Sequence, residues 1–136
     1  MSELHKAMHI SASGMLAQNV RVRVISQNIA NSDSLATKPG ELPYRRQTVS
    51  FRNELNRALG TNTVKVHEIG VDKSAFGSRL DPGHPASDEN GYVQLPNVKR
   101  MIEMVDLRAA QRSYQANLRV VDIARTMVSR TLELLK

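Results

Sequence analysis

The sequence predicts a mainly α fold with a small β part, and two observations support this prediction. The last forty residues, 97–136, contain no Pro and no Gly, and their apolar residues recur at intervals of three or four. Residues 3–31 show the same spacing, which is that of one face of a helix. Between these segments, residues 32–96 combine turn-forming residues with short alternating stretches, which indicates loops and short strands.

The first long helix is predicted over residues 3–31. Its seam advances by alternating steps of four and three, a heptad-like pattern with two polar positions, and consists of Leu4, Met8, Ser11, Met15, Gln18, Val22, Ile25 and Ile29. Gly14 interrupts this helix, and its missing side chain indicates either close approach by another helix or local flexibility. We expect Asn31 to end the helix as a left-handed cap.

The first half of the middle region is predicted to form two strands with a helical turn between them. Residues 44–51 favour a short strand, in which Val49 and Phe51 share one face. Residues 52–59 are predicted to form one or two helical turns that Gly60 ends. Residues 63–71 are the strongest strand candidate, because Val and Ile alternate there with polar residues.

The second half of the middle region is dominated by turn chemistry. Asp81-Pro82-Gly83-His84-Pro85 suits a turn, with Pro-Gly at the centre of a type II turn. Asn90-Gly91 predicts a hairpin turn that leads into a strand over residues 92–95. Residues 75–79 give little signal.

The last helix is predicted over residues 97–136, with Asn97 as its N-cap. A continuous helix of this length would be about 60 Å long at roughly 1.5 Å per residue, so we expect it to find most of its burial on other chains. Its seam includes Arg112, for which we hypothesise a carboxylate partner across a subunit contact. The alternative is that only the stem of Arg112 lies on the seam while its head reaches water.

Composition and charge restrict the function. The chain has 136 residues, no Cys and a formal charge of +6, so disulfides and thiolate chemistry are excluded. Residues 32–96 hold eight basic and eight acidic side chains, so the positive excess lies on the two terminal segments. An alternative function is therefore a basic helical binding module for nucleic acid or another acidic partner, although dispersed charge without interleaved aromatics argues against nucleic acid as the partner.

The sequence does not predict an enzyme, a metal site or a cofactor. Asp81, His84, Asp88 and Glu89 lack the spacing of a calcium loop and are better explained as turn residues. His67 and Glu68 are neighbours on a predicted strand, so they would point to opposite faces. No segment approaches the length of about 20 apolar residues that crosses a bilayer, and the start has no apolar signal-peptide core.

The chain contains several motifs of a known protein family. Ser11-Ala12-Ser13-Gly14-Met15, Gln18, Arg21 and Val24-Ile25-Ser26-Gln27-Asn28-Ile29-Ala30-Asn31 stand in its N-terminal part, and this pattern resembles the N-terminal signature of the flagellar basal-body rod and hook proteins. The part that is similar to the proximal rod member of the family is Tyr44-Arg45-Arg46, Asp81-Pro82-Gly83-His84-Pro85, Asp88-Glu89-Asn90-Gly91-Tyr92-Val93, Pro96-Asn97-Val98, Glu103-Met104-Val105-Asp106 and Arg112-Ser113-Tyr114-Gln115-Ala116-Asn117. The resemblance covers nearly the whole chain.

The resemblance implies a fold and a cellular setting. Residues 1–31 and 97–136 would pair as a coiled coil that forms the rod core, and residues 32–96 would form a short loop and hairpin insertion. The implied partners are other rod subunits, the export-gate adaptor at the rod base and the flagellar type III export apparatus. The implied location is the periplasmic rod of the basal body, reached without a cleaved signal. A chain that is threaded through the narrow channel of an export apparatus cannot be rigidly folded. We therefore expect both terminal segments to be largely disordered before assembly.

The seams and the resemblance together predict a subunit interface. It comprises Met15, Gln18, Arg21, Val22, Ile25, Asn28, Ile29, Asn31, Tyr44, Arg45, Arg46, Asp81, His84, Tyr92, Arg112, Tyr114, Asn117, Val120, Ile123, Met127 and Leu134.

Overall fold

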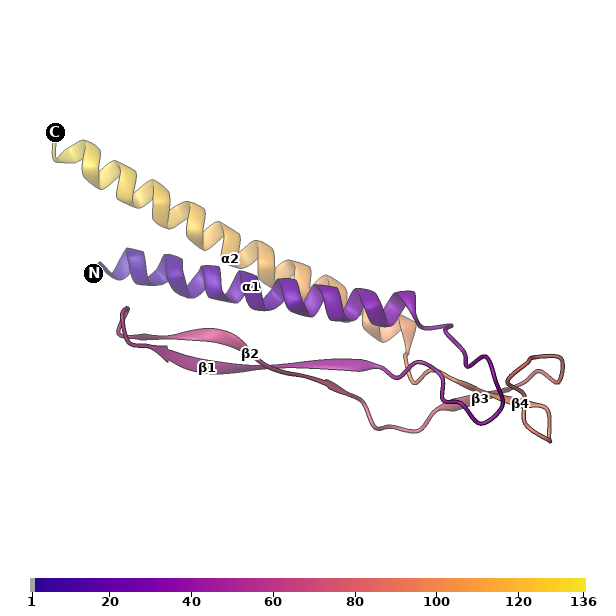
Figure 1. Cartoon of the computed structure of the whole chain (residues 1–136). Helices are drawn as coiled ribbons and strands as arrows, with labels where there is room; N and C mark the ends of the chain where they lie inside the picture. The colour runs from indigo at the N-terminus through magenta and orange to yellow at the C-terminus, as the bar shows by residue number, and fades with distance from the viewer. Residues whose placement is uncertain (1) are drawn as a thin grey trace. The chain divides into compact units, whose positions relative to one another are not determined.

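The computed structural model describes residues 2–136 and contains two long helices with four strands between them (Figure 1). The elements in chain order are α1 (Glu3–Ala30), β1 (Gln47–Asn56), β2 (Thr61–Val71), β3 (Gly77–Leu80), β4 (Tyr92–Leu95) and α2 (Arg100–Leu134). The strands form two separate two-stranded sheets, β1 with β2 and β3 with β4. The predicted mainly α class with a small β part is therefore confirmed.

Helix α1 uses the predicted seam. Every seam residue from Leu4 to Ile29 is buried or half-buried, whereas Leu16, beside the seam, is 69% exposed. The predicted left-handed cap at Asn31 is wrong, because among residues 2–136 only glycines have positive φ. Instead Asn31 keeps a helical hydrogen bond from its backbone N–H to the Gln27 carbonyl at 3.0 Å, and its side-chain Nδ2 donates to the same oxygen at 2.9 Å.

The hairpin of β1 and β2 is longer than the sequence predicted. The helical turns expected over residues 52–59 are wrong, because β1 continues to Asn56 and a tight turn follows. The Asn56 side chain accepts hydrogen bonds from the backbone N–H groups of Ala58 and Leu59, and Gly60 takes a φ of 63°. The turn chemistry of Asn56 and Gly60 thus joins two strands where short-range pattern had indicated a helix.

The β3–β4 pair contains one strand that the sequence did not predict. Strand β3 pairs antiparallel with β4, from Gly77 opposite Leu95 to Leu80 opposite Tyr92. All four β3 residues are exposed, so there is no alternation of buried and exposed positions to detect. The predicted strand over residues 92–95 is confirmed.

The loop between β3 and β4 contains two of the predicted turns, with corrections. Asp81 O accepts from His84 N at 3.1 Å, but Gly83 lacks the positive φ that a type II turn requires. Gly91 has a φ of 81°, yet Asn90-Gly91 does not join adjacent strand ends. It closes the Asp88–Gly91 turn inside the longer loop, through a bond from Gly91 N to Asp88 O at 3.0 Å.

Helix α2 begins three residues later than predicted. Asn97 is not its N-cap, because the Asn97 side chain contacts the loops described below, and the first helical bond runs from Glu103 N to Lys99 O. The predicted apolar seam of α2 is largely exposed; Ile123 is 60% and Leu134 is 87% exposed. The covered positions follow a different heptad that contains Glu103, Ala110, Asn117 and Ala124.

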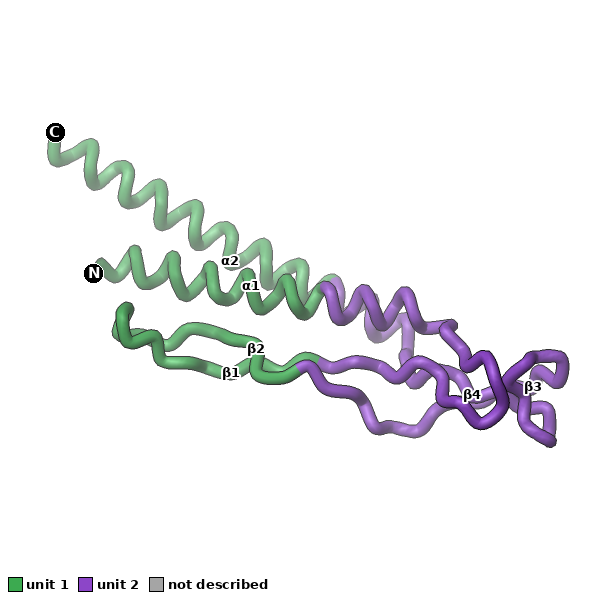
Figure 2. The backbone as a smooth tube through the Cα atoms, in the orientation of Figure 1, with its two compact units in different colours: residues 1–22, 49–68, 108–136 green, residues 23–48, 69–107 purple. Residues whose placement is uncertain are grey.

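The chain divides into two units, shown in different colours in Figure 2. Unit 1 comprises Met1–Val22, Val49–Glu68 and Arg108–Lys136, and unit 2 comprises Arg23–Thr48 and Ile69–Leu107. Each has a thin core. The buried residues of unit 1 include Ala17, Leu59, Ala110 and Ala124, and those of unit 2 include Val24, Ile25, Asn28, Val93 and Glu103.

Within unit 1, Gly14 of α1 faces α2 closely. A Cβ built on Gly14 would lie 2.8 Å from the Asn117 Nδ2 atom, so close helix approach, one of the two alternatives for this glycine, is confirmed. The hydroxyl of Ser13, the residue before Gly14, accepts a hydrogen bond from Val64 N of β2 at 3.1 Å. Consecutive residues of α1 therefore hold the second helix and the first hairpin of this unit.

Candidate functional site

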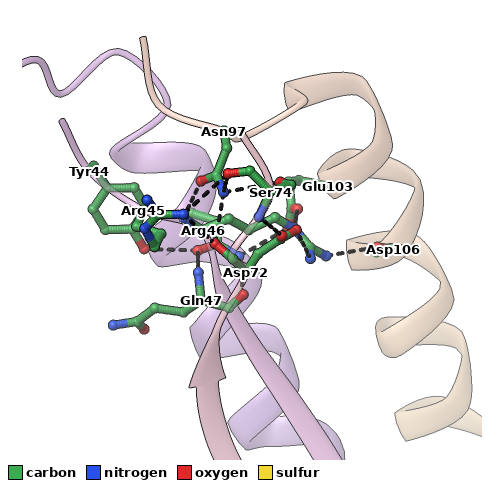
Figure 3. A network of polar contacts seen from close by, with 10 residues as sticks. Tyr44, Arg45, Arg46, Gln47, Asp72, Ser74, Asn97, Glu103 and Asp106 are labelled. Carbon is green, nitrogen blue, oxygen red and sulfur yellow. Dashed lines mark hydrogen bonds and ion pairs between the residues drawn. The ribbon is translucent and has the colours of Figure 1, made fainter. Parts of the chain in front are cut away.

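Glu103 is the centre of the most extensive polar network in the chain (Figure 3). Its carboxylate sits on the first turn of α2 and is only 1% exposed. A carboxylate that is removed from water must be paired and hydrogen-bonded, since an isolated buried charge is costly. The surrounding residues of unit 2 meet this requirement.

Arg46 supplies the positive charge. Its guanidinium donates from Nε to Glu103 Oε1, and the same group reaches Asp72 Oδ2 at 3.4 Å and Asp106 Oδ2 at 4.0 Å. One planar cation therefore serves three carboxylates that belong to α2 and to the segment after β2. The rigid fork of guanidinium donors suits this arrangement better than a lysine ammonium would.

Asn28 binds the other Glu103 oxygen from α1. Its Nδ2 donates to Glu103 Oε2 at 3.3 Å and to the Gln47 carbonyl at 2.9 Å. Its Oδ1 accepts from the Tyr44 hydroxyl at 2.8 Å and from Gln47 N at 2.9 Å. An amide has two donors and two acceptor sites, and the 1% exposed Asn28 uses all four.

Asn97 and Arg45 fasten the backbone around Arg46. Asn97 Oδ1 accepts from Arg46 N at 2.7 Å, while its Nδ2 donates to the Asp72 carbonyl at 2.9 Å. Arg45 also donates to the Asp72 carbonyl, at 2.9 Å, and its guanidinium lies 4.2 Å from the ring centre of Phe76. Four chain segments thereby converge on one small volume of unit 2.

The network shifts three pKa values in directions that fit its geometry. The hydrogen bond to Glu103 raises the pKa of Arg46 above its ordinary value, so this cation stays charged. Hydrogen bonds from Ser74, with a smaller effect of Arg46, lower the pKa of Asp72. Burial, and secondarily the charge of Glu103, raise the pKa of Tyr44.

This arrangement is suited to structural locking rather than to chemistry. Its buried carboxylate already contacts Arg46 and Asn28, so it is not poised as a free acid or base. Among residues 2–136, no group of three or more His, Cys, Asp or Glu side chains is placed to hold a metal ion. The residues Asp81 and His84 instead hold turns of their own loop.

The structure brings some of the predicted interface residues together inside unit 2. Asn28, Tyr44, Arg45 and Arg46 belong to the Glu103 network, and Ile25 is buried beside it. Asn31 continues the end of α1. Other predicted interface residues lie outside this network and are half-buried. These are Met15, Gln18, Arg21, Val22, Ile29, Asp81, His84, Tyr114 and Asn117.

The structure leaves a second set of the predicted interface residues exposed. These are Tyr92, Arg112, Val120, Ile123, Met127 and Leu134. Arg112 makes no ion pair with any residue between 2 and 136. Five of the six lie on one stripe of α2.

Sequence reasoning missed several residues of the network. Glu103, Asp72 and Ser74 were not predicted as site residues, and Asn97 was assigned to a cap. A signal for Glu103 was present in the sequence, because it shares a spacing of seven with Ala110, Asn117 and Ala124. That heptad is made of small and polar residues, so a search for apolar side chains passes over it.

Two kinds of comparison identify the class of protein. The family model described as "Flagellar basal body rod FlgEFG protein C-terminal" matches residues 89–134. This region contains strand β4 and the whole of helix α2, so the C-terminal part of the chain is similar to that of the flagellar basal-body rod proteins.

Full-length relatives make the assignment specific. A flagellar basal-body rod protein FlgC of Agrobacterium fabrum is 48% identical over 136 residues, which cover all of this chain and 98% of the relative. FlgC proteins of Bacillus subtilis and Salmonella typhimurium are each 38% identical, over 98% and 92% of this chain and 99% and 92% of the relatives. The chain belongs to the FlgC family of flagellar basal-body rod proteins.

Membership of this family bears on three of the sequence predictions. It confirms the resemblance to rod proteins and the prediction of a structural, non-enzymatic role, and it does not favour the alternative of a nucleic-acid-binding module. Over residues 2–136, neither helix has the combination of length and apolarity that a membrane span requires.

Proposed function

We propose that the chain is a structural subunit of the proximal part of the flagellar rod, which transmits torque from the motor to the hook. The observation that carries this proposal is the exposed stripe of α2. It repeats at steps of three and four up to Met127, with a last step of seven, and consists of Ile102, Val105, Ala109, Arg112, Ala116, Val120, Ile123, Met127 and Leu134. Apolar side chains in such a continuous row are typical of a surface that other subunits cover.

The exposed stripe is distinct from the covered face of the same helix. At 3.6 residues per turn, the mean directions of the two sets are separated by roughly 105° around the helix axis. The covered face contains Ala110 and Ala124, which are 0% and 3% exposed. One face of α2 therefore serves its own chain, and the other is available to neighbouring rod subunits, whether copies of this chain or related rod proteins.

Arg112 fits the same proposal. It interrupts the apolar stripe, is exposed and has no carboxylate partner within residues 2–136. In a packed rod its guanidinium would pair with a carboxylate of the next subunit and fix the register of the helices. We therefore propose that the exposed predicted interface residues of α2, together with Tyr92, contact neighbouring subunits.

We also propose that α1 and α2 pair as a coiled coil. The alternating steps of four and three along α1 and the seven-residue spacing of the covered α2 positions support it, as does the contact of Gly14 with Asn117. Because the chain contains no Cys, the variant Gly14→Cys with Asn117→Cys tests the pairing on a clean background. We expect a disulfide in this variant but not in the control Gly14→Cys with Arg119→Cys, which uses the opposite side of α2.

Family membership also supports a proposal for the cellular setting of the chain. The chain would be exported by the flagellar type III apparatus without a cleaved signal and would join the rod in the periplasm. Its partners there would be other rod subunits and the export-gate adaptor at the rod base. The exposed apolar stripe and the thin cores support a chain that completes its burial in an assembly.

The substitution Ile123→Glu tests the lattice role. In flagellated cells that carry only this variant, we expect loss of swimming and loss of rods from isolated basal bodies, because a charge enters an apolar contact. Gln115→Glu adds the same charge on the polar face of α2 and should leave both unchanged. Immunoblotting of the exported fraction separates failed assembly from failed export; normal rods with Ile123→Glu would contradict the proposal.

A further inference from the structure

Two histidines at the start of α1 form a pair that the rod assembly does not explain. His5 and His9 are separated by four positions, which places them on one side of a helix. Their Nε2 atoms are 3.0 Å apart, and their rings meet edge to face with centres 4.7 Å apart. Both belong to unit 1, whereas the acidic loop of residues 81–89 belongs to unit 2.

We infer that His5 and His9 form a bidentate site for a divalent transition metal of the copper or nickel class. With metal–nitrogen bonds of about 2.0–2.1 Å, two imidazoles at a right angle place their nitrogens about 2.9 Å apart. A tetrahedral angle would need about 3.3 Å with the same bonds. The observed 3.0 Å matches adjacent positions of the square-planar or tetragonal geometry that Cu²⁺ and Ni²⁺ prefer.

The chemistry of the pair also permits binding. In the neutral pair one Nε2–H donates to the other Nε2. When the metal binds, that hydrogen moves to Nδ1 of its own ring, and rotation of the imidazole rings turns both Nε2 lone pairs toward the ion. No net proton is lost. Water would occupy the remaining positions, since the described residues place no third His, Cys, Asp or Glu with the pair.

Charged side chains near the histidine pair affect how strongly it would bind a cation. Glu3 is already paired with Lys6 at 2.9 Å, so that carboxylate and that ammonium offset each other. Arg125 of α2 lines the same surface hollow as His5, together with Met8 and Ser129. Its positive charge opposes a bound cation, so removing it should strengthen binding.

Calorimetric titration of the purified full chain with CuSO₄ and with NiCl₂ tests the site. We expect one ion per chain, and weakening by about tenfold or more in His5→Gln and in His9→Gln, because each imidazole acts as an intramolecular ligand for the other's ion. Glutamine can preserve a hydrogen bond to the remaining histidine. If the pair had only a structural role, the metal affinity would therefore be the same in these variants as in the parent chain. His67→Gln is the matched control and should bind like the parent chain.

Two further outcomes decide the assignment. Arg125→Gln should bind the metal more tightly, and metal addition should increase the far-ultraviolet helical signal of the parent chain but not of His9→Gln. Stoichiometric binding that survives in both single variants would place the ion on the amino terminus, His67 or His84 and would overturn the proposal, as would an absence of binding. None of these measurements depends on rod assembly.

Discussion

The Asn28 side-chain amide of α1 donates a hydrogen bond to the Glu103 carboxylate of α2 at 3.3 Å, across 75 positions of sequence. The same carboxylate receives the Arg46 guanidinium. Unit 2 is therefore centred on polar groups rather than on large apolar side chains. Because each buried polar group relies on its partners, the network makes several sharp predictions.

Replacing Arg46 should strongly destabilise the chain. Arg46→Met keeps an aliphatic stem but leaves the 1% exposed Glu103 carboxylate without its cation, and breaking a buried pair in this way costs about 3–5 kcal/mol. The double variant Arg46→Met with Glu103→Gln should recover much of that loss, since no buried charge remains. Urea unfolding, followed by circular dichroism, measures both.

The matched control for that prediction is Arg52→Met. Arg52 also pairs with a carboxylate, Glu54 at 3.2 Å, but the two side chains are 55% and 37% exposed. Solvent screens such pairs, so they contribute little to stability. Equal effects of the Arg46 and Arg52 variants would show that burial of Glu103 does not govern the stability of this region.

Alkaline pH should weaken the fold through Tyr44. Burial and Glu103 raise the pKa of Tyr44 in the folded chain, so its contribution is fully present below the ordinary tyrosine pKa of about 10. As pH rises from that value through the raised folded pKa, the unfolded chain loses its proton first and is favoured. Unfolding free energies measured at a series of pH values should therefore fall above about pH 10.

Tyr44→Phe isolates this effect from other alkaline titrations. The variant loses the hydroxyl that donates to Asn28, so it should be less stable near neutral pH by about 1–3 kcal/mol. It should also show a shallower decline above pH 10. A decline as steep as that of the parent chain would assign the alkaline effect to other groups.

Gly14 and Asn117 should behave as a coupled pair. Alanine favours a helix over glycine by about 1 kcal/mol, but its Cβ would meet Asn117 Nδ2 at 2.8 Å. Because that atom ends a side chain that can rotate, Gly14→Ala alone should change thermal stability by less than the full gain. In a chain that already carries Asn117→Ala, the substitution Gly14→Ala should raise the stability by the full helix-propensity gain.

A bulkier side chain at position 14 extends this test. Gly14→Leu should destabilise by about 1–3 kcal/mol, as expected for overpacking. The measurement is a double-mutant cycle by thermal unfolding. Additive effects of the substitutions at positions 14 and 117 would mean that the two helices do not contact each other here in solution.

Amide exchange should vary strongly along the helices of the isolated chain. The sequence led us to expect that residues 1–31 and 97–136 are largely disordered before assembly, but the Glu103 network changes this prediction for unit 2. Amides of residues 25–28 and 103–107 should be protected, whereas those of residues 129–134, all exposed in α2, should exchange rapidly.

Hydrogen–deuterium exchange with mass spectrometry provides the measurement, and isolated basal bodies provide the comparison. Residues 129–134 should become protected in the assembled rod, where neighbouring subunits would cover α2. Uniform protection of both helices in the isolated chain would contradict the expectation that assembly completes their burial.

The sequence by itself determined the two long helices and the rod-protein family. Helical spacing and the lack of Pro and Gly in residues 97–136 are local properties, and short-range sterics and hydrogen bonding decide them. The family motifs likewise stand in the sequence. Strand β2 was predictable for the same reason, since alternation is also local. The Asn90-Gly91 signal located the start of β4, although this turn lies inside a longer loop and does not join β4 to its partner strand.

Tertiary structure alone decided which faces are covered. The apolar seam of α2 pointed to Val120 and Ile123, yet both are exposed, and the covered heptad runs through Glu103 and Ala110. Long-range partners cause this reversal, because Glu103 becomes tolerable in a core only when Arg46 and Asn28 reach it. Asn97 was assigned to a helix cap for the same reason, since its partners Arg46 and Asp72 lie 51 and 25 positions away.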